Sequence, residues 1–231
     1  MPSRRGKLIV IDGSDGSGKA TQTELLVKRL RREGRKVKTL DFPQYHGNLF
    51  GALIAECLRG EHGNFPELDP KIASTLYAAD RFESKQKLER WLAAGNIVIL
   101  DRYVSANQMH QGGKIRDARA RAKFLQWLDD VEFGVFKIPR PDVIVYLSVP
   151  VAVSLELLKN KDQGKKKQYT QGRGDVVEND IRYLEASRRG AEAIVQKLND
   201  WRRIECTDKK GTMRSRETIH EDVYSIVKRY V

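Results

Sequence analysis

The residues best suited to chemistry stand in one short run, GSDGSGKAT, from Gly13 to Thr21. Up to Lys19 the run fits the pattern G-x-x-x-x-G-K of a phosphate-binding loop. Glycines in such a loop let backbone N–H groups point at phosphate oxygens, and the helix that follows adds partial positive charge at its N-terminus. Lys19 can reach the β- and γ-phosphates. The run therefore predicts a nucleotide phosphate site.

Position 20 departs from this pattern. Ala20 stands where Ser or Thr usually supplies a hydroxyl to Mg²⁺. Thr21 is no simple substitute, because one residue further round a helix turns the side chain by about 100°. The metal must then rely on phosphates, water and acids elsewhere in the chain. Asp15 inside the loop and Asp101 at the end of a buried apolar run are the candidates.

A second reactive stretch is ILDRYVSANQMHQGG, residues 99–113. Ligands of parallel α/β sheets bind beyond the carboxyl ends of the strands, which is where Asp101 and Arg102 fall. A structural ion pair is the alternative role for Arg102. Tyr77 and Arg81 are four residues apart on a predicted helix and share one face. Such a pair can stack on a base and bond its edge, although a core tyrosine beside a surface arginine explains the pattern equally well.

The elements that must position these residues follow from the apolar pattern. Short apolar runs predict strands at 7–12, 36–42, 97–100, 142–149 and 202–207, and helical spacing predicts helices at 18–34, 48–59, 71–94, 116–135, 150–161, 177–199 and 217–230. Strands that alternate with helices indicate an α/β fold, a five-stranded parallel sheet with helices on both faces in three layers. We expect one domain, 1–231, with a mobile basic loop at about 161–177.

Composition limits the partners. The 231 residues carry a net charge of +12, which favours an anionic partner, but the basic residues have no interleaved aromatics and no zinc pattern, so stable nucleic-acid binding is not expected. No apolar run approaches the ~20 residues of a membrane span. Cys57 and Cys206 lack metal-like spacing and are expected to be reduced. The run LIVI (8–11) is too short for a signal peptide core, so we expect a cytoplasmic protein.

Six segments in this order resemble the thymidylate kinases, and the resemblance covers nearly the whole chain. The segments are IDGSDGSGKATQ (11–22), DFPQY (41–45), AADR (78–81), DRYVSANQMHQG (101–112), IPRPD (138–142) and DVVE (175–178). The resemblance implies a P-loop NTPase fold, a homodimer through the helices near 48–59 and 71–94, and an enzyme of dTTP synthesis. That enzyme would phosphorylate dTMP to dTDP with Mg·ATP.

The resemblance also implies roles for single residues. The ATP-binding residues would be Gly13, Ser14, Asp15, Gly16, Ser17, Gly18, Lys19, Ala20 and Thr21. Tyr45, Tyr77, Arg81, Arg102, Asn107 and Gln111 would bind dTMP, with Tyr77 stacked on thymine and Arg81 at its edge. Lys19, Arg102, Asp15, Asp101 and Arg173 would be catalytic, and Asp15 and Asp101 would hold Mg²⁺.

Arg173 belongs to this set because of the basic loop. One type of thymidylate kinase carries an arginine inside the phosphate loop, at the position of Gly16 here. The other type delivers the cation from a closing lid. Lys165, Lys166, Lys167 and Arg173 are the lid candidates, and we favour Arg173 because a planar guanidinium suits phosphate. A solvated charge run is the alternative for any single lysine.

Departures from the family pattern leave two alternatives open. Ser105 and Ala106 are exchanged relative to the common DRYVASN, Met109 replaces a small residue, and His110 stands where Tyr is frequent. These changes lie near the predicted base pocket, so the first alternative is a related kinase for deoxynucleosides or another monophosphate. The second is a non-enzymatic nucleotide-binding module that contacts nucleic acid through its positive charge, for which Ala20 is the main argument.

Overall fold

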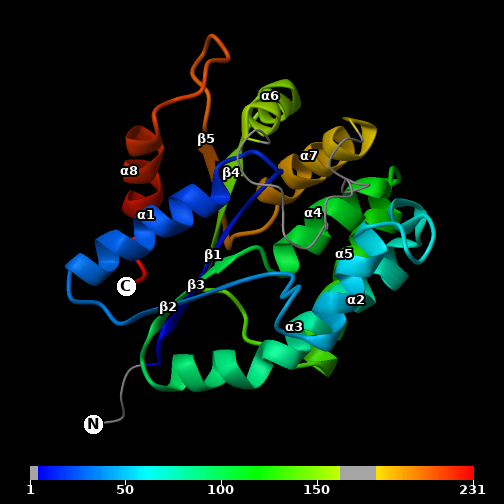
Figure 1. The fold of residues 1–231 in the computed structure, drawn as a ribbon, viewed down its shortest axis with the longest axis horizontal. Coiled ribbons are helices and arrows are strands. Elements are labelled where there is room, and N and C mark those ends of the chain that lie inside the picture. Colours follow the sequence, from blue (N-terminus) through cyan, green and yellow to red (C-terminus); the bar gives the residue numbers. More distant parts are fainter. Residues whose placement is uncertain (1–4, 162–180) are drawn as a thin grey trace.

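A five-stranded sheet lies between two layers of helices in the computed structural model, which describes residues 5–161 and 181–231 (Figure 1). The strands are β1 (Lys7–Gly13), β2 (Val37–Asp41), β3 (Ile97–Asp101), β4 (Val143–Ser148) and β5 (Trp201–Glu205). Their order is β2-β3-β1-β4-β5, and every neighbouring pair is parallel. The predicted α/β class and all five predicted strands are confirmed.

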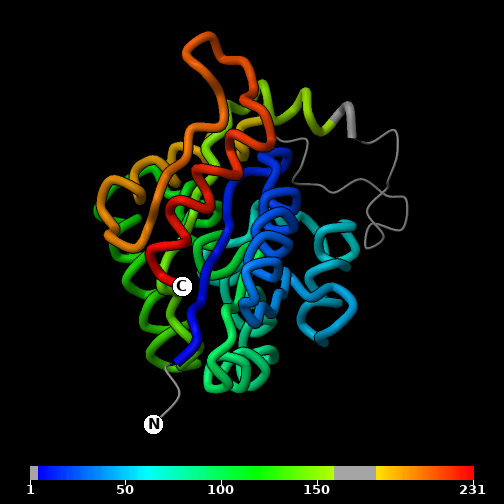
Figure 2. Tube along the Cα trace, turned by 90° about the vertical axis from the view of Figure 1, so that its left-hand side faces the viewer, coloured from blue at the N-terminus to red at the C-terminus, as the bar shows by residue number. Residues whose placement is uncertain are grey.

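Helices cover both faces of the sheet. They are α1 (Lys19–Arg32), α2 (Leu49–Leu58), α3 (Pro70–Ala93), α4 (Val104–Lys114), α5 (Ala118–Asp129), α6 (Val151–Lys161), α7 (Ile181–Val195) and α8 (Arg216–Val227). One face carries α1 and α8, and the other carries α3, α4, α5 and α7. The segment of α2 and the turn after it (cyan in Figure 2) project to the side of the molecule opposite α8.

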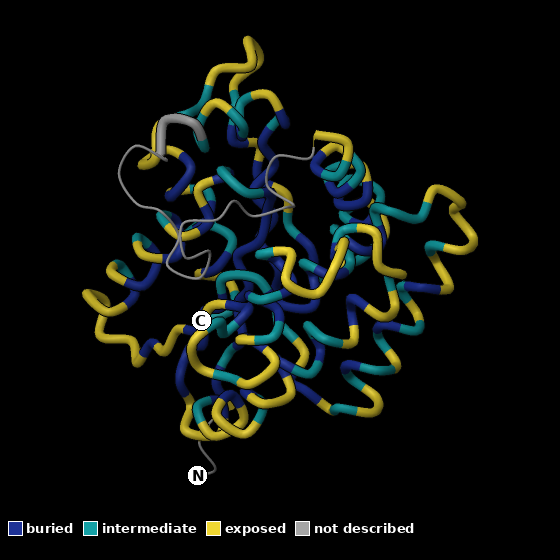
Figure 3. The backbone as a smooth tube through the Cα atoms, turned by 45° about the vertical axis from the view of Figure 1, so that its right-hand side comes forward, coloured by how far each residue is buried: buried dark blue, intermediate teal, exposed yellow. Residues whose placement is uncertain are grey.

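Alternation along the strands builds the two halves of the core. Leu8 and Val10 of β1 face α3, α4 and α7, whereas Ile9 and Ile11 face α1 and α8. Because both faces are covered, the strand is apolar throughout rather than alternating with polar residues. Figure 3 shows the result as buried strands (dark blue) inside helices whose outer turns are exposed (yellow).

Two segments within the described residues contain helical turns that are not α-helical. The predicted helix 116–135 is α-helical only to Asp129, and a π-helical segment, η2 (Asp130–Val135), completes it. The segment 60–70, between two predicted helices, contains a short 3₁₀ turn, η1 (Phe65–Glu67). Over a segment of six residues, apolar spacing does not separate a π-helical turn from an α-helical one, so the wider turn of η2 was not predictable from the pattern.

Parallel pairing brings the carboxyl ends of the strands to one edge of the sheet. β1 is the central strand, with β3 on one side and β4 on the other. The chain leaves the sheet in opposite directions on the two sides of β1, and the loop after β1 lies at this point, where ligands of such sheets bind. Within the described ranges no helix is long and apolar enough to cross a membrane. Cys57 and Cys206 are buried free thiols, as expected.

Candidate active site

The phosphate loop connects β1 to α1 and has the backbone that its glycines require. Gly16 and Gly18 adopt left-handed φ values of 79° and 87°. A Cβ atom added to Gly16 would lie only 2.5 Å from the carbonyl oxygen of Ser154 in α6. An arginine at this position would not fit this backbone. The hydroxyls of Ser14 and Ser154 lie 3.2 Å apart, which also ties the loop to α6.

Lys19 lies inside the loop rather than in solvent. Its ammonium donates to the carbonyl oxygens of Gly13 (2.9 Å) and Ser14 (2.7 Å) and lies 3.8 Å from the carboxylate of Asp15. Burial, and then the charge of Arg102, lower the pKa of Lys19 to about 8. Ala20, in the first turn of α1, is exposed, and the neighbouring Thr21 is half-buried.

Arg102 completes the cationic part of the site. Its guanidinium pairs with Asp15 and contacts Nε2 of His110 at 3.0 Å. Burial opposes the charge of Arg102, but the carboxylates of Asp15 and Asp12 outweigh it and raise the pKa. Arg102 has a left-handed φ of 66°, a conformation that costs a non-glycine residue about 1–3 kcal/mol. Asp15 therefore contacts the predicted donor-phosphate lysine and the predicted acceptor-phosphate arginine at once.

Three carboxylates lie at the carboxyl ends of three neighbouring strands, where Asp41 ends β2, Asp101 ends β3 and Asp12 is the last residue but one of β1. Asp101 of β3 is in register with Asp41 of β2 and with Ile11 of β1, which precedes Asp12. Burial, reinforced by Asp12 and Asp41, raises the pKa of Asp101 while Lys19 lowers it. Its carboxylate makes no hydrogen bond or ion pair within the described part of the chain. Asp101 was predicted as a site residue, whereas Asp12, which ends the predicted strand 7–12, and Asp41, the last residue but one of the predicted strand 36–42, were not.

Asp12 is fully buried and has a clear structural role. Its carboxylate accepts from the backbone N–H of Gly13 at 2.8 Å and from the hydroxyl of Ser105. Burial raises the pKa of Asp12. Ser105 is one of the two residues exchanged relative to the common family pattern, and here its hydroxyl fixes the start of α4 against the phosphate loop.

Arg81 lies deeper than a residue that meets only substrate would. It is 1% exposed, its guanidinium pairs through two nitrogens with the carboxylate of Glu132, and Nη1 donates to the carbonyl oxygen of Tyr103 at 3.3 Å. Glu132 belongs to η2, whose wider turn the sequence did not predict. Three of the five N–H groups of Arg81 are used by Glu132 and Tyr103. The contact of Arg81 with the thymine edge stays a prediction.

The other predicted dTMP-binding residues surround the space beside α3 and α4. Tyr45 and Tyr77 are half-buried and pack against the cluster of α2 and α3. Asn107 donates to the carbonyl oxygen of Ser74 at 3.2 Å. Gln111 is 3% exposed and its side-chain oxygen has no hydrogen-bond partner in the described part of the protein. Arg173, Lys165, Lys166, Lys167 and nearly all of the predicted lid lie outside the described residues.

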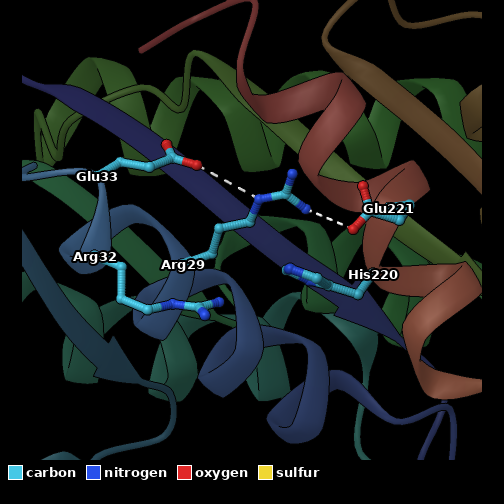
Figure 4. A pocket seen from close by; sticks show the side chains of 5 residues that line it. All are labelled: Arg29, Arg32, Glu33, His220 and Glu221. Carbon is cyan, nitrogen blue, oxygen red and sulfur yellow. Dashed lines mark hydrogen bonds and ion pairs between the residues drawn. The ribbon is translucent and has the colours of Figure 1, made fainter.

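A separate hollow lies between α1 and α8, away from the phosphate loop. It is lined by Arg29, Arg32, Glu33, His220 and Glu221 (Figure 4). Arg29 pairs with Glu221 at 2.7 Å and with Glu33 at 3.5 Å, and its guanidinium lies 3.4 Å from the ring centre of Tyr224. These contacts join α1 to α8, and the carboxylates of Glu33 and Glu221 neutralise the charge of Arg29.

The glycine loop between a central strand and a helix, with an acid and an arginine at the end of the next strand, defines a P-loop phosphotransferase. Comparison with known proteins agrees. The family model for thymidylate kinase matches residues 11–210. A thymidylate kinase of Mycobacterium tuberculosis is 36% identical over 68% of this chain and 71% of its own, and that of Plasmodium falciparum is 27% identical over 95% and 89%.

A solved thymidylate kinase structure from Candida albicans shares the fold, with a TM-score of 0.70 and 22% identity over 97% of this chain and 92% of that one. The chain belongs to the thymidylate kinase family. Members of this family phosphorylate dTMP to dTDP with ATP, and the chain is thus a nucleoside monophosphate kinase of nucleotide biosynthesis. The alternative of a non-enzymatic binding module is not supported.

Proposed function

We propose that phosphoryl transfer takes place above the carboxyl ends of β1 and β3, between Lys19 on the ATP side and Arg102 on the dTMP side. The observation that carries this proposal is the position of Asp15, whose carboxylate contacts both cations. A phosphoryl group passing between two anionic nucleotides needs positioning and neutralisation of charge more than covalent help. The two cations on either side of one carboxylate supply both.

The chain's own residues have distinct parts in this transfer. Backbone N–H groups of the loop and the N-terminus of α1 bind the ATP phosphates, with Lys19 at the β- and γ-phosphates. Arg102 binds the acceptor phosphate, and Asp15 holds Arg102 beside the loop. No general base is needed, because the oxygen of a monophosphate is already an anion when it attacks. Tyr77, Asn107 and Gln111 hold the thymine base, and the unpartnered oxygen of Gln111 supports a ligand there.

Mg²⁺ is proposed as the cofactor, with Asp15 and Asp101 as its protein ligands. Among the described residues no group of three or more metal-ligating side chains occurs. Mg²⁺ in kinases is commonly held by one or two carboxylates together with phosphates and water, so the oxygen donors at this edge fit it. When bound with ATP it would neutralise negative charge on the phosphates. Asp101 is the better placed of the two acids, because Asp15 already pairs with Arg102.

Ala20 tests this arrangement. Since the metal is held without a side chain from position 20, we expect Ala20→Ser to change kcat/KM for ATP by less than about tenfold, or 1.4 kcal/mol. Ala52→Ser, another exposed helical alanine, is the matched control. Steady-state kinetics with Mg²⁺ and Mn²⁺ measure the effect. A rise beyond tenfold in Ala20→Ser alone would contradict the proposed ligand set.

A substrate panel tests the proposed acceptor. The Candida albicans enzyme is described as having broad substrate specificity, so kcat/KM is best compared for dTMP, dUMP, dCMP, AMP and thymidine with ATP. We expect dTMP to have the highest value and thymidine none, because Arg102 needs a phosphate. Turnover of thymidine, or a preference for AMP over dTMP, would overturn the proposed acceptor.

Lys19→Ala should lower turnover by about 10²-fold or more, whereas Lys28→Ala, 65% exposed on the same helix, should not.

We also propose a homodimer and a cytoplasmic location. Leu49 and Phe50 of α2 and Ile72 and Phe82 of α3 are large apolar side chains exposed by 39–82%, which supports a second copy packed on these helices. Sedimentation velocity tests the dimer, and a monomer at micromolar concentration would refute it. The buried free thiols of Cys57 and Cys206 suit a reducing compartment.

A further inference from the structure

His110 lies between Arg102 and α7 and contacts both. Its Nε2 atom is 3.0 Å from Nη1 of Arg102, and its Nδ1 atom is 2.9 Å from the hydroxyl oxygen of Ser187 in α7. The imidazole also stacks on the ring of Tyr183, with centroids 5.6 Å apart and planes 2° apart. Each ring nitrogen and one ring face therefore has a partner, so the orientation of the imidazole is fixed.

The hydrogen bonds determine where the imidazole carries its proton. Arginine has only donors, so Nε2 must present its lone pair to Arg102. The hydroxyl of Ser187 donates its single proton to the carbonyl oxygen of Tyr183 at 2.9 Å, so its oxygen accepts from Nδ1–H. Burial and the charge of Arg102 lower the pKa of His110 to about 3, which keeps the ring neutral. The neutral Nδ1–H tautomer is the one that satisfies every contact.

A neutral acceptor suits an arginine that has to bind an anion. Asp15 already brings one negative charge to the guanidinium. A carboxylate in place of His110 would cancel more of the positive charge, whereas the imidazole fixes the direction of the guanidinium and leaves the charge in place. Asp15 and His110 occupy two of the five N–H groups of Arg102, and three are left for phosphate oxygens.

The helices that carry these residues are held in close contact. A Cβ atom on Gly113 of α4 would lie 2.5 Å from the carbonyl oxygen of Ala186, and one on Gly190 of α7 would lie 2.9 Å from that of Met109. The two backbones thus meet where only glycine fits. Because this contact fixes the spacing of α4 and α7, it also fixes the distance from His110 to Ser187.

We propose that His110 is a positioning residue for Arg102, aligned by Ser187 so that the guanidinium stays directed toward the phosphate loop. This inference rests on the proposed contact of Arg102 with the acceptor phosphate. It assigns to α7 a part in the reaction, since the hydrogen-bond chain runs from its backbone through Ser187 and His110 to Arg102.

Three variants of His110 and Arg102 test the inference. His110→Phe keeps a ring that can stack on Tyr183 but has no acceptor, and His110→Gln restores an acceptor at about the position of Nε2. We expect His110→Phe to lower kcat/KM for dTMP by about ten- to a hundredfold with an unchanged KM for ATP, and His110→Gln to recover much of it. In an Arg102→Ala background His110→Phe should have no further effect on activity or on dTMP affinity by calorimetry. His62→Phe, an exposed histidine, is the control.

The outcomes separate the inference from the function on which it rests. If Arg102→Ala leaves turnover unchanged, the proposed role of Arg102 fails and the inference with it. If Arg102→Ala is impaired but His110→Phe is not, only the inference fails. Equal losses from His110→Phe with and without Arg102 would show a merely structural role. Should His110→Phe not fold, Ser187→Ala keeps the imidazole and should lower kcat/KM a fewfold, and only when Arg102 is present.

Discussion

Arg81 and Arg102 each pair with a carboxylate inside the protein, yet the two pairs use the guanidinium differently. Two guanidinium nitrogens of Arg81 donate to the carboxylate of Glu132, and the side chains of Arg81 and Glu132 are 2% and 0% exposed. Arg102 and Asp15 remain 18% and 23% exposed, and the second partner of Arg102 is the neutral His110. Burial and the remaining N–H groups thus distinguish an arginine that stabilises the fold from one that can take up an anion.

The largest effect is expected from breaking the Arg81 pair. Glu132→Gln leaves a buried guanidinium without its counter-charge, and the free energy of unfolding should fall by about 3–5 kcal/mol. Glu221→Gln removes a carboxylate that is 63% exposed and paired with Arg29, and should cost less than about 1 kcal/mol. Urea denaturation of both variants measures the difference. Similar losses of unfolding free energy in the two variants would mean that the Arg81–Glu132 pair stabilises the fold no more than an exposed ion pair does.

Removal of Arg102 should affect activity rather than stability. Arg102→Ala is expected to lower kcat/KM for dTMP by about 10²–10³-fold, because a cation aimed at the transferring group is lost. Its free energy of unfolding should change less than that of Glu132→Gln, since Asp15 remains partly solvated and near Lys19. Kinetics and denaturation on the same preparation give both values. An inactive variant that is also the less stable of the two would erase the contrast between the arginines.

A smaller effect is expected with pH, through Lys19. Its pKa of about 8 lies below the ordinary lysine value, because it is buried and close to Arg102. As the pH rises through 8 the ammonium of the free enzyme loses its proton, so ATP affinity should fall by up to about tenfold per pH unit. Calorimetry between pH 7 and 10 measures this. In Arg102→Ala the decline should begin at higher pH, and a decline at the same pH would show that Arg102 does not influence Lys19.

Local patterns in the sequence were sufficient for the sheet and the phosphate loop. Apolar runs identified β1 and β3, and the spacing of Gly13, Gly18 and Lys19 identified the loop between β1 and α1. The pattern of 116–135 failed to show η2, because a π-helical turn and an α-helical turn carry similar apolar spacing. Nor did the pattern indicate that Glu132, near the end of this predicted helix, is fully buried against Arg81.

The sequence by itself determined the phosphate loop, because the loop's backbone conformation depends on glycines within a few residues of each other and on the helix that follows directly. Only the tertiary structure decided which partners each arginine has and how deeply it is buried. The partners of Arg81 and Arg102 are 51 and 87 residues away, and His110 meets Ser187 across 77 residues. Charge partners, burial and the tautomer of a histidine are properties of packed neighbours, and parallel strands and close helices bring those neighbours together from distant parts of the chain.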